Sequence, residues 1–217
     1  MMETFYKITN PDGTAFHDGQ TKYELGKTVR KRNCSNPILC TDTVLHASRT
    51  LIGALKYAKL PLAIWKVEGD PVVSDLEDKC GFFALTVVKQ IDPSDELLGF
   101  RYHEACHPVN PMLIQNDVAD ADIADLKSWA SVRDSAGDSV WASVRDSVWD
   151  SAGDSVWDSV WAYIGSLFLK HEEGVYPFRS AVDLWRRGFV PLKIEEKWHL
   201  YGWRDGRAVS LYEGEEF

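Results

Sequence analysis

Cysteine is scarce in this sequence. The chain has only Cys34, Cys40, Cys80 and Cys106, and no two of them form a CxxC pair. Zinc knuckles need such closely spaced pairs, so that class of metal site is excluded and no metal is expected. The first ten residues are too short and too polar for a secretory signal, which predicts reduced thiols and a cytoplasmic location.

Long apolar runs and phosphate-binding glycine motifs are also missing. No run approaches the roughly 20 residues that a membrane-spanning helix needs, so no membrane partner is expected. Neither GxGxxG nor a P-loop occurs, which leaves nucleotide cofactors without a fingerprint and predicts no resident cofactor. Acidic residues outnumber basic ones by 33 to 24, and this net charge of −9 disfavours nucleic acid as a partner. We interpret the local basic run Lys27, Arg30, Lys31 and Arg32 as a solvated loop.

Hydrophobic residues are abundant, at 45% of the chain, and the patterns predict an α+β fold. Residues 1–112 read as an N-terminal α+β domain with a small mixed sheet. Its expected strands are 4–9, 62–68 and 82–91, and a helix is expected within 43–58. Residues 113–128 read as a helical lead-in, 129–168 as a long tetrapeptide-repeat helix, and 169–217 as a short helix-plus-hairpin unit. In that last unit the helix is expected at 177–187 and the hairpin turns at Arg204-Asp205-Gly206.

The most distinctive segment is a four-residue repeat from Trp129 to Ile164. One template, (Trp/Arg/Gly)-(Ala/Asp)-Ser-(Val/Ala), covers it, and the third position is Ser in every unit from Ser131 to Ser159. A helix advances about 100° per residue, so a four-residue motif precesses around its axis and leaves no fixed apolar face. Such a helix needs to be enclosed by other protein, or to supercoil with further copies in a right-handed sense. A β-solenoid and a disordered low-complexity tract are the alternatives.

We therefore expect a homo-oligomer that self-associates through the aromatic and valine positions of the repeat. These are Trp129, Val132, Val140, Trp141, Val144, Val148, Trp149, Val156, Trp157, Val160 and Trp161.

Three stretches resemble an uncharacterised group of phage and gut-metagenome proteins. They are YELGKTV…ILCTDTVLHAS…ALKYA…AIWKVEG near the N-terminus, the WASVRDSV-type repeats, and AYIGSLF…GVYPFRSAVDLWRRGFVP. The resemblance covers nearly the whole chain. It implies a phage or bacterial origin, hence the cytoplasm of a bacterial host cell, and it implies no activity.

The segment Cys40…Leu45-His46-Ala47-Ser48…Ala54-Leu55-Lys56-Tyr57 also resembles ADP-ribosyltransferase-like folds, in which a strand motif precedes a helix ending in Tyr. Those enzymes hold a nicotinamide dinucleotide beside that segment. The resemblance implies a scaffold but no chemistry, because neither Glu68 nor Glu104 sits in a recognisable catalytic motif. The candidate ligand-binding residues are His17, Cys40, His46, Ser48, Tyr57 and Glu68, with a small-molecule nucleotide as the possible ligand.

Two further patterns invite a catalytic interpretation. His103-Glu104-Ala105-Cys106-His107 matches the HExxH signature of zinc hydrolases, but Pro108 follows at once and should end the helix that this chemistry requires. His46 lies near Cys40, yet no Asp or Asn can be assigned to orient it as a base. We assign no catalytic residue.

Two functions follow from these observations. The first is a non-enzymatic, self-associating protein in which the repeat scaffolds an N-terminal binding module. The second is a nucleotide-binding or ligand-sequestering protein, in a phage a possible antagonist of host defence, or an enzyme on an ADP-ribosyltransferase-like scaffold.

Overall fold

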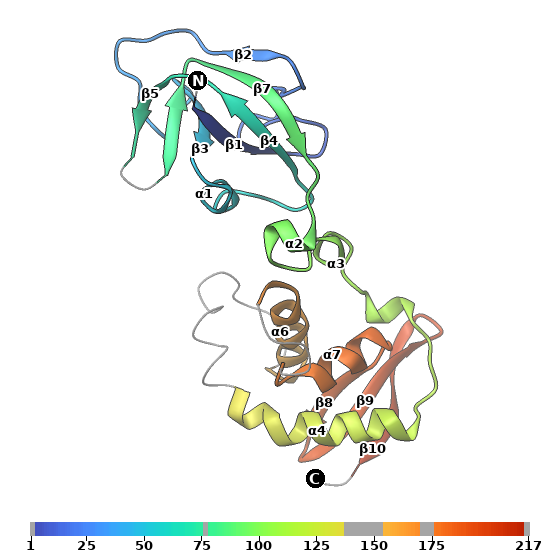
Figure 1. Cartoon of the computed structure of the whole chain (residues 1–217). Coiled ribbons are helices and arrows are strands. Elements are labelled where there is room, and N and C mark those ends of the chain that lie inside the picture. The colour runs from blue at the N-terminus through green and yellow to red at the C-terminus, as the bar shows by residue number, and fades with distance from the viewer. Residues whose placement is uncertain (1–2, 76–77, 137–153, 170–175, 215–217) are drawn as a thin grey trace. The chain divides into compact units, whose positions relative to one another are not determined.

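The computed structural model describes residues 3–75, 78–136, 154–169 and 176–214. The chain divides into two compact units, residues 1–97 and 98–217 (Figure 1). Each unit has its own buried core, and both combine helices with antiparallel sheet, which confirms the α+β class.

The first unit is built on a seven-stranded sheet in the order β2-β7-β4-β1-β3-β6-β5. Its strands are β1 (Thr4–Thr9), β2 (Thr28–Arg30), β3 (Leu45–Ser48), β4 (Ala63–Glu68), β5 (Pro71–Ser74), β6 (Lys79–Phe82) and β7 (Ala84–Ile91). Helix α1 (Leu51–Leu55) follows β3, and α2 (Asp95–Leu98) follows β7. The expected strands at 4–9 and 62–68 are thus confirmed to within one residue.

The expectation of a mixed sheet is wrong. Every neighbouring pair of strands in this sheet is antiparallel. The physical reason lies in the connections: β4 to β7 follow one another without a helical crossover, and parallel pairing requires a crossover of a dozen or more residues. The 82–91 segment is also split, because β6 ends at Phe82 and β7 begins at Ala84.

The core of the first unit lies on one face of the sheet. Phe5 from β1 and Phe82 from β6 meet edge to face at 4.8 Å between ring centres, and neither side chain is exposed. Trp65 from β4 packs in the same cluster, and its Nε1 donates a hydrogen bond of 2.8 Å to the buried Thr9 Oγ1. These contacts hold β1 in the middle of the sheet between β4 and β3.

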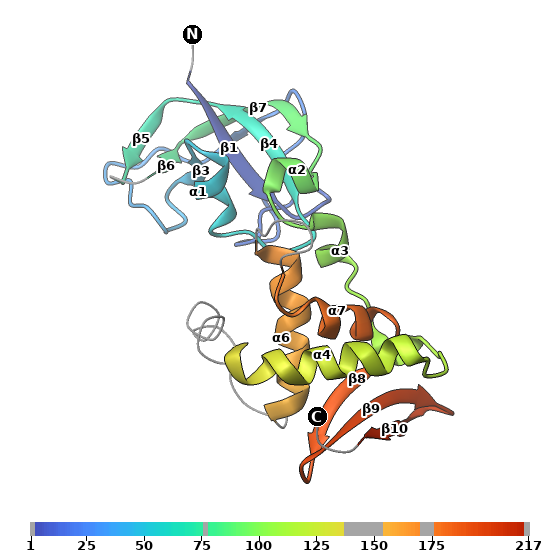
Figure 2. The same ribbon diagram turned by 60° about the horizontal axis from the view of Figure 1, so that its bottom comes forward.

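The second unit combines three longer helices with a three-stranded sheet. The helices are α4 (Asp120–Ala136), α6 (Asp154–Phe168) and α7 (Arg179–Arg186), preceded by α3 (Tyr102–Cys106) and the 3-10 turn η1 (Pro111–Leu113). The strands are β8 (Val190–Ile194), β9 (Lys197–Arg204) and β10 (Arg207–Gly214), in the order β10-β9-β8. Figure 2 shows the three helices on one side of this sheet.

The C-terminal helix and hairpin are confirmed. Helix α7 ends where Gly188 adopts a φ of 89°, a conformation that glycine takes without strain. Strands β9 and β10 pair across Asp205 and Gly206, whose φ values of 49° and 77° are those of a type I′ turn. Strand β8 was not expected. Its Pro191 is tolerated because β8 lies at the edge of the sheet, where a missing N–H leaves no partner unpaired.

The repeat does not form one straight helix through its described residues. Arg133 belongs to α4 and Asp158 to α6, yet the Nε of the first lies 2.6 Å from Oδ2 of the second. In a single helix these two residues would be about 37 Å apart. Both helices instead contact α7, so the two ends of the repeat pack on the same tail helix.

The boundary between the two units also differs from the expected one at residue 112. Residues 98–112 pack with the second unit, because α3 contacts α6 and the Trp185 Nε1 of α7 donates a hydrogen bond to Val109 O. The expected domain of residues 169–217 is likewise not separate from the repeat: Leu126, Trp129 and Tyr163 share one core with Leu184 and Trp198. Among the helices of the described residues, none has the length and apolar character needed to span a membrane.

Candidate functional site

A split in the first sheet opens the principal candidate site. Strands β1 and β3 pair only through Tyr6 and Ser48. In an antiparallel ladder the next partners would be Lys7 with Ala47 and then Ile8 with His46, but these residues are not paired. All of them line a pocket instead, so the pocket lies where the two central strands diverge.

The pocket has a cavity volume of about 490 Å³, which is within the range of sites for small molecules. Its walls come from β1, β3, the loop after β1, α1 with the turn that follows it, and the start of β6. The lining residues are Tyr6, Lys7, Ile8, Ala15, Phe16, His17, Cys40, His46, Ala47, Ser48, Ala54, Tyr57, Lys59 and Lys79.

The described lining is rich in basic side chains. Three lysines and two histidines face the cavity, and none of the described Asp or Glu residues does. This is unexpected in a chain whose net charge is −9. Because opposite charges attract strongly in a partly dehydrated cleft, such a lining favours an anionic ligand.

Lys7 is the most perturbed of these cations. Lys7 lies on the same face of β1 as Phe5 and Thr9, which are both fully buried. Its side chain therefore starts from the buried face of the strand. Burial lowers the pKa of Lys7 to about 8, while Asp18 partly opposes this shift and Lys79 adds to it. Its Nζ lies 5.1 Å from the centre of the Tyr23 ring. A substantial fraction of Lys7 is therefore unprotonated just above neutral pH.

His46 has a positioning role toward Cys40. Its Nε2 accepts a hydrogen bond of 2.9 Å from the backbone N–H of Cys40, a residue whose φ of 63° lies in the strained left-handed region. Burial lowers the pKa of His46 to about 4, and the charges of Lys79 and Lys7 add to the shift. The neutral ring thus carries its proton on Nδ1, and the lone pair of Nε2 already accepts the hydrogen bond from Cys40 N. This arrangement does not supply a base for the Cys40 thiol.

Lys79 links two residues of the pocket rim. Its Nζ lies 3.1 Å from Cys40 Sγ and 4.2 Å from the centre of the exposed Tyr57 ring. The ammonium over the ring is a cation–π contact, which fixes both groups in one orientation. An aromatic ligand ring and an anionic group could therefore meet Tyr57 and Lys79 side by side.

The wall formed by α1 depends on a close approach to Asp78. Thr50 caps the helix by accepting a hydrogen bond from Gly53 N, and its own N–H donates to Asp78 Oδ1 at 2.8 Å. A Cβ atom on Gly53 would lie 1.6 Å from Asp78 Oδ2, so only glycine fits there. This contact places Ala54 and Tyr57 at the cavity.

Five of the six residues expected to bind ligand line this one cavity. They are His17, Cys40, His46, Ser48 and Tyr57. The sixth, Glu68, is not among the lining residues; it ends β4 opposite Thr4, at the other end of β1 from Lys7 and Ile8. Whether the five bind a ligand stays a prediction.

Sequence reasoning missed the lysines of the site. Lys7 could have been found, because a lysine in step with Phe5 and Thr9 breaks the apolar face of a central strand. Lys59 and Lys79 had no such signal, since they lie far apart in the chain and reach the pocket only through the fold.

The HExxH segment serves the second unit's packing. Helix α3 ends at Cys106, and His107 has a φ of −134° and a ψ of 66°, outside the helical region. The two histidines are therefore not presented one turn apart on a helix, which the zinc chemistry requires. Within the described residues, no group of three or more possible metal-ligating side chains gathers in one place.

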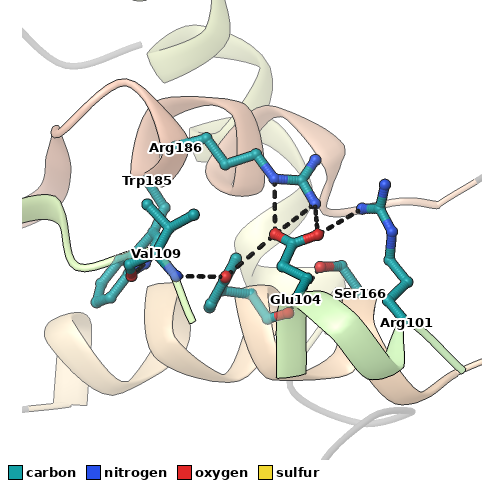
Figure 3. Close-up of polar contacts among 7 residues, drawn as sticks. Arg101, Glu104, Val109, Ser166, Trp185 and Arg186 are labelled. Carbon is teal, nitrogen blue, oxygen red and sulfur yellow. Dashed lines mark hydrogen bonds and ion pairs between the residues drawn. The ribbon is translucent and has the colours of Figure 1, made fainter. Parts of the chain in front are cut away.

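Glu104 of this segment is the centre of a polar cluster that joins three helices (Figure 3). Arg186 Nη2 of α7 lies 2.9 Å from each of the two carboxylate oxygens of Glu104, and the Tyr163 hydroxyl of α6 donates to Oε1 at 3.1 Å. Arg101 adds an ion pair of 3.3 Å. Tyr163 in turn accepts from Val109 N. A carboxylate held by two guanidinium groups and a hydroxyl is not available as a general base.

The residues expected to drive self-association fall into three groups. Trp129 is 2% exposed inside the core of its own unit, and Val132 is partly buried against that core. Val160 and Trp161 are also partly buried in α6. Val156 and Trp157 lie in α6, but their side chains are not described, and Val140, Trp141, Val144, Val148 and Trp149 lie outside the described residues. For Trp129 the covering partner is the chain itself.

The fold and the pocket define an α+β protein with a lysine-lined cavity in a split antiparallel sheet. In comparisons with protein-family models, curated proteins and solved structures, nothing matches this chain.

Proposed function

We propose that residues 1–97 form a binding module for a small anionic molecule that carries an aromatic ring, with a nucleotide as the chemical class that fits both features. The observation that carries the proposal is the lining of the pocket, in which three lysines and two histidines face the cavity and no carboxylate of the described residues does. Phosphate groups are the natural counterpart of such a lining, and Tyr57 offers an exposed ring for a base.

We propose sequestration rather than turnover as the role of this module. No acidic side chain lines the cavity, and the lone pair of His46 is engaged by a backbone N–H. The described lining therefore offers neither a carboxylate nor the His46 lone pair as a general base for hydrolytic or transfer reactions. This reasoning supports a ligand-sequestering protein over an enzyme on the same scaffold.

Calorimetric titration of the full-length chain tests the proposal with three probes: ADP, inorganic pyrophosphate and adenosine. We expect saturable binding of ADP, weaker binding of pyrophosphate and the weakest binding of the uncharged adenosine. Lys79→Met should weaken ADP binding at least about tenfold, equivalent to about 1.4 kcal/mol. The matched control is Lys89→Met, which removes an exposed lysine of β7 outside the pocket and should change nothing.

Two results would overturn the proposal. One is the absence of saturable binding for all three probes at millimolar concentration. The other is equal loss of ADP affinity in Lys79→Met and Lys89→Met, because that would mean that ADP is attracted by overall charge and not by this pocket.

Self-association through the repeat stands as a second proposal. It is supported by the precession of the four-residue motif, which leaves apolar side chains without a single face to cover them. The burial of Trp129 within its own chain argues that internal packing meets part of this need. Light scattering decides between self-association and internal packing. A monomer of about 24.6 kDa at all concentrations would end the proposal of self-association.

A further inference from the structure

We infer that Lys7 is a covalent capture site, whose side-chain amine forms a reversible imine with an aldehyde or ketone group of an anionic ligand. The inference rests on the proposed function, because the pocket must first hold the anion. It adds the chemical class of the ligand, a carbonyl compound that also carries a phosphate or carboxylate group.

The placement of Lys7 distinguishes it from the other lysines of the pocket. Lys59 is exposed to solvent. The Nζ of Lys79 already contacts the Cys40 sulfur and the face of the Tyr57 ring. Lys7 rises from the buried face of β1, and in the described part of the chain no carboxylate lies within ion-pair distance of it.

The surroundings of Lys7 are those that activate an amine. A lysine is a poor nucleophile while protonated, and enzymes activate one by removing it from water or by placing another cation beside it. Lys7 is partly buried and lines the same cavity as Lys79. Burial lowers its pKa to about 8, Asp18 opposes this shift and Lys79 adds to it. A lowered pKa means that more of the Lys7 amine is neutral near pH 7 than in an ordinary lysine.

The reaction needs no further reagent. The Nζ lone pair of neutral Lys7 forms a bond to the carbonyl carbon as the C=O π bond breaks, and one N–H proton passes to the former carbonyl oxygen to give a carbinolamine. The C–O bond then breaks, the hydroxyl leaves as water with the second N–H proton, and the C=N bond forms, so one water molecule is released for each ligand captured. No electron transfer is involved, and hydrolysis reverses the step.

The remaining cations would place the ligand for this reaction. Lys79 and Lys59 line the same cavity as Lys7, and together they offer an anionic group several donors. An anion held there brings a nearby carbonyl carbon within reach of the amine and raises its effective concentration. Carbonyl compounds that lack an anionic group should therefore react far more slowly.

The test uses pyridoxal 5′-phosphate, an aromatic aldehyde with a phosphate group, on the full-length chain. The protein is incubated with one equivalent, the imine is fixed with cyanoborohydride, and the modified lysine is identified by peptide mass spectrometry. We expect Lys7 to be labelled at least about tenfold more than any other lysine. Pyridoxal, which lacks the phosphate, should label Lys7 several-fold less, and excess pyrophosphate should protect it.

Lys7→Arg is the critical variant, because it keeps a positive charge in the pocket but holds no nucleophilic amine. It should abolish the selective label, and Lys89→Arg should leave the label on Lys7 intact. Labelling spread over the exposed lysines, or labelling that Lys7→Arg does not change, would overturn this inference. If the unmodified chain binds ADP but Lys7 is not selectively labelled, the imine alone is rejected. If the unmodified chain shows neither ADP binding nor a selective label, the proposed function is rejected as well.

Discussion

Arg133 and Asp158 form an ion pair of 2.6 Å between α4 and α6, although 25 residues separate them in the chain. Their side chains are only 22% and 13% exposed. The guanidinium also lies 5.7 Å from the ring of Trp198 in β9. One arginine of the repeat thus connects both helices to the sheet of the second unit.

We predict that Arg133→Ala lowers the free energy of unfolding of the second unit by about 1–3 kcal/mol, because it leaves a mostly buried carboxylate without its partner. Urea denaturation followed by tryptophan fluorescence measures this. Glu24→Gln is the control, since its ion pair with Lys22 is more than half exposed and should contribute less than about 1 kcal/mol. Equal effects of the two substitutions would contradict the role given to Arg133.

Glu104→Gln should also destabilise the second unit, by about 1–3 kcal/mol, because an amide cannot replace the charge that Arg186 and Arg101 share. Thermal unfolding without zinc measures the contribution of Glu104 to the ion-pair cluster, and thermal unfolding with zinc tests a role of the HExxH segment in binding metal. Glu213→Gln, at an exposed ion pair with Lys197, is the matched control. A zinc-dependent gain in stability that His107→Ala removes would instead point to a metal site.

The His46 ring should titrate near pH 4 rather than near its ordinary value of 6.5. Between these two values the unfolded chain binds a proton that the folded chain does not. Stability contributed by neutral His46 is therefore present above pH 6.5 and is lost as the pH falls toward 4. The loss should amount to about 1–2 kcal/mol, less than the full shift implies, because the ring is partly exposed.

Proton NMR titration of the histidine ring signals, assigned with His46→Gln, tests this pKa. His46→Gln should also weaken the fall in stability below pH 6.5, while His199→Gln, in the second unit, should not alter the titration of His46. An ordinary pKa for His46 would mean that the ring is not buried beside Lys79 and Lys7 in solution as it is in this structure.

Gly53→Ala should lower stability by about 1–3 kcal/mol and weaken ADP binding, because the new methyl group would overlap Asp78 and displace α1 from the pocket wall. Calorimetry and thermal unfolding measure the two effects. The double variant with Asp78→Ala removes the overlap and should recover part of the loss. Additive losses in the double variant would show that the close contact is not the cause.

A stabilising substitution is expected in the turn between β8 and β9. Glu195 and Glu196 have φ values of 49° and 67°, which side-chain-bearing residues adopt only with strain. Glu196→Gly should raise the free energy of unfolding by about 0.5–1 kcal/mol, even though it removes an exposed ion pair with Lys193. Glu213→Gly, at a paired position near the end of β10, should do the opposite when measured by the same urea denaturation.

The sequence by itself determined the local elements whose signals are local. The alternation of side chains along residues 4–9 predicts β1, because successive side chains of a strand point to opposite faces. Asp205-Gly206 predicts a hairpin turn, because its φ values depend on only a few neighbouring residues. The α+β class follows from such patterns. The sequence also pointed to the segment around His46 as part of a site, through a family resemblance.

Only the tertiary structure decided how these elements combine. It separated the ends of the repeat into two helices around α7, because burying Trp129 and Tyr163 in one core is a property of packing and not of period. It gathered Lys7, Lys59 and Lys79 at one cavity, because the sheet splits between β1 and β3 where the ladder stops after a single pair. The interaction between two charges depends on their distance in space, and the order of residues along the chain does not give that distance.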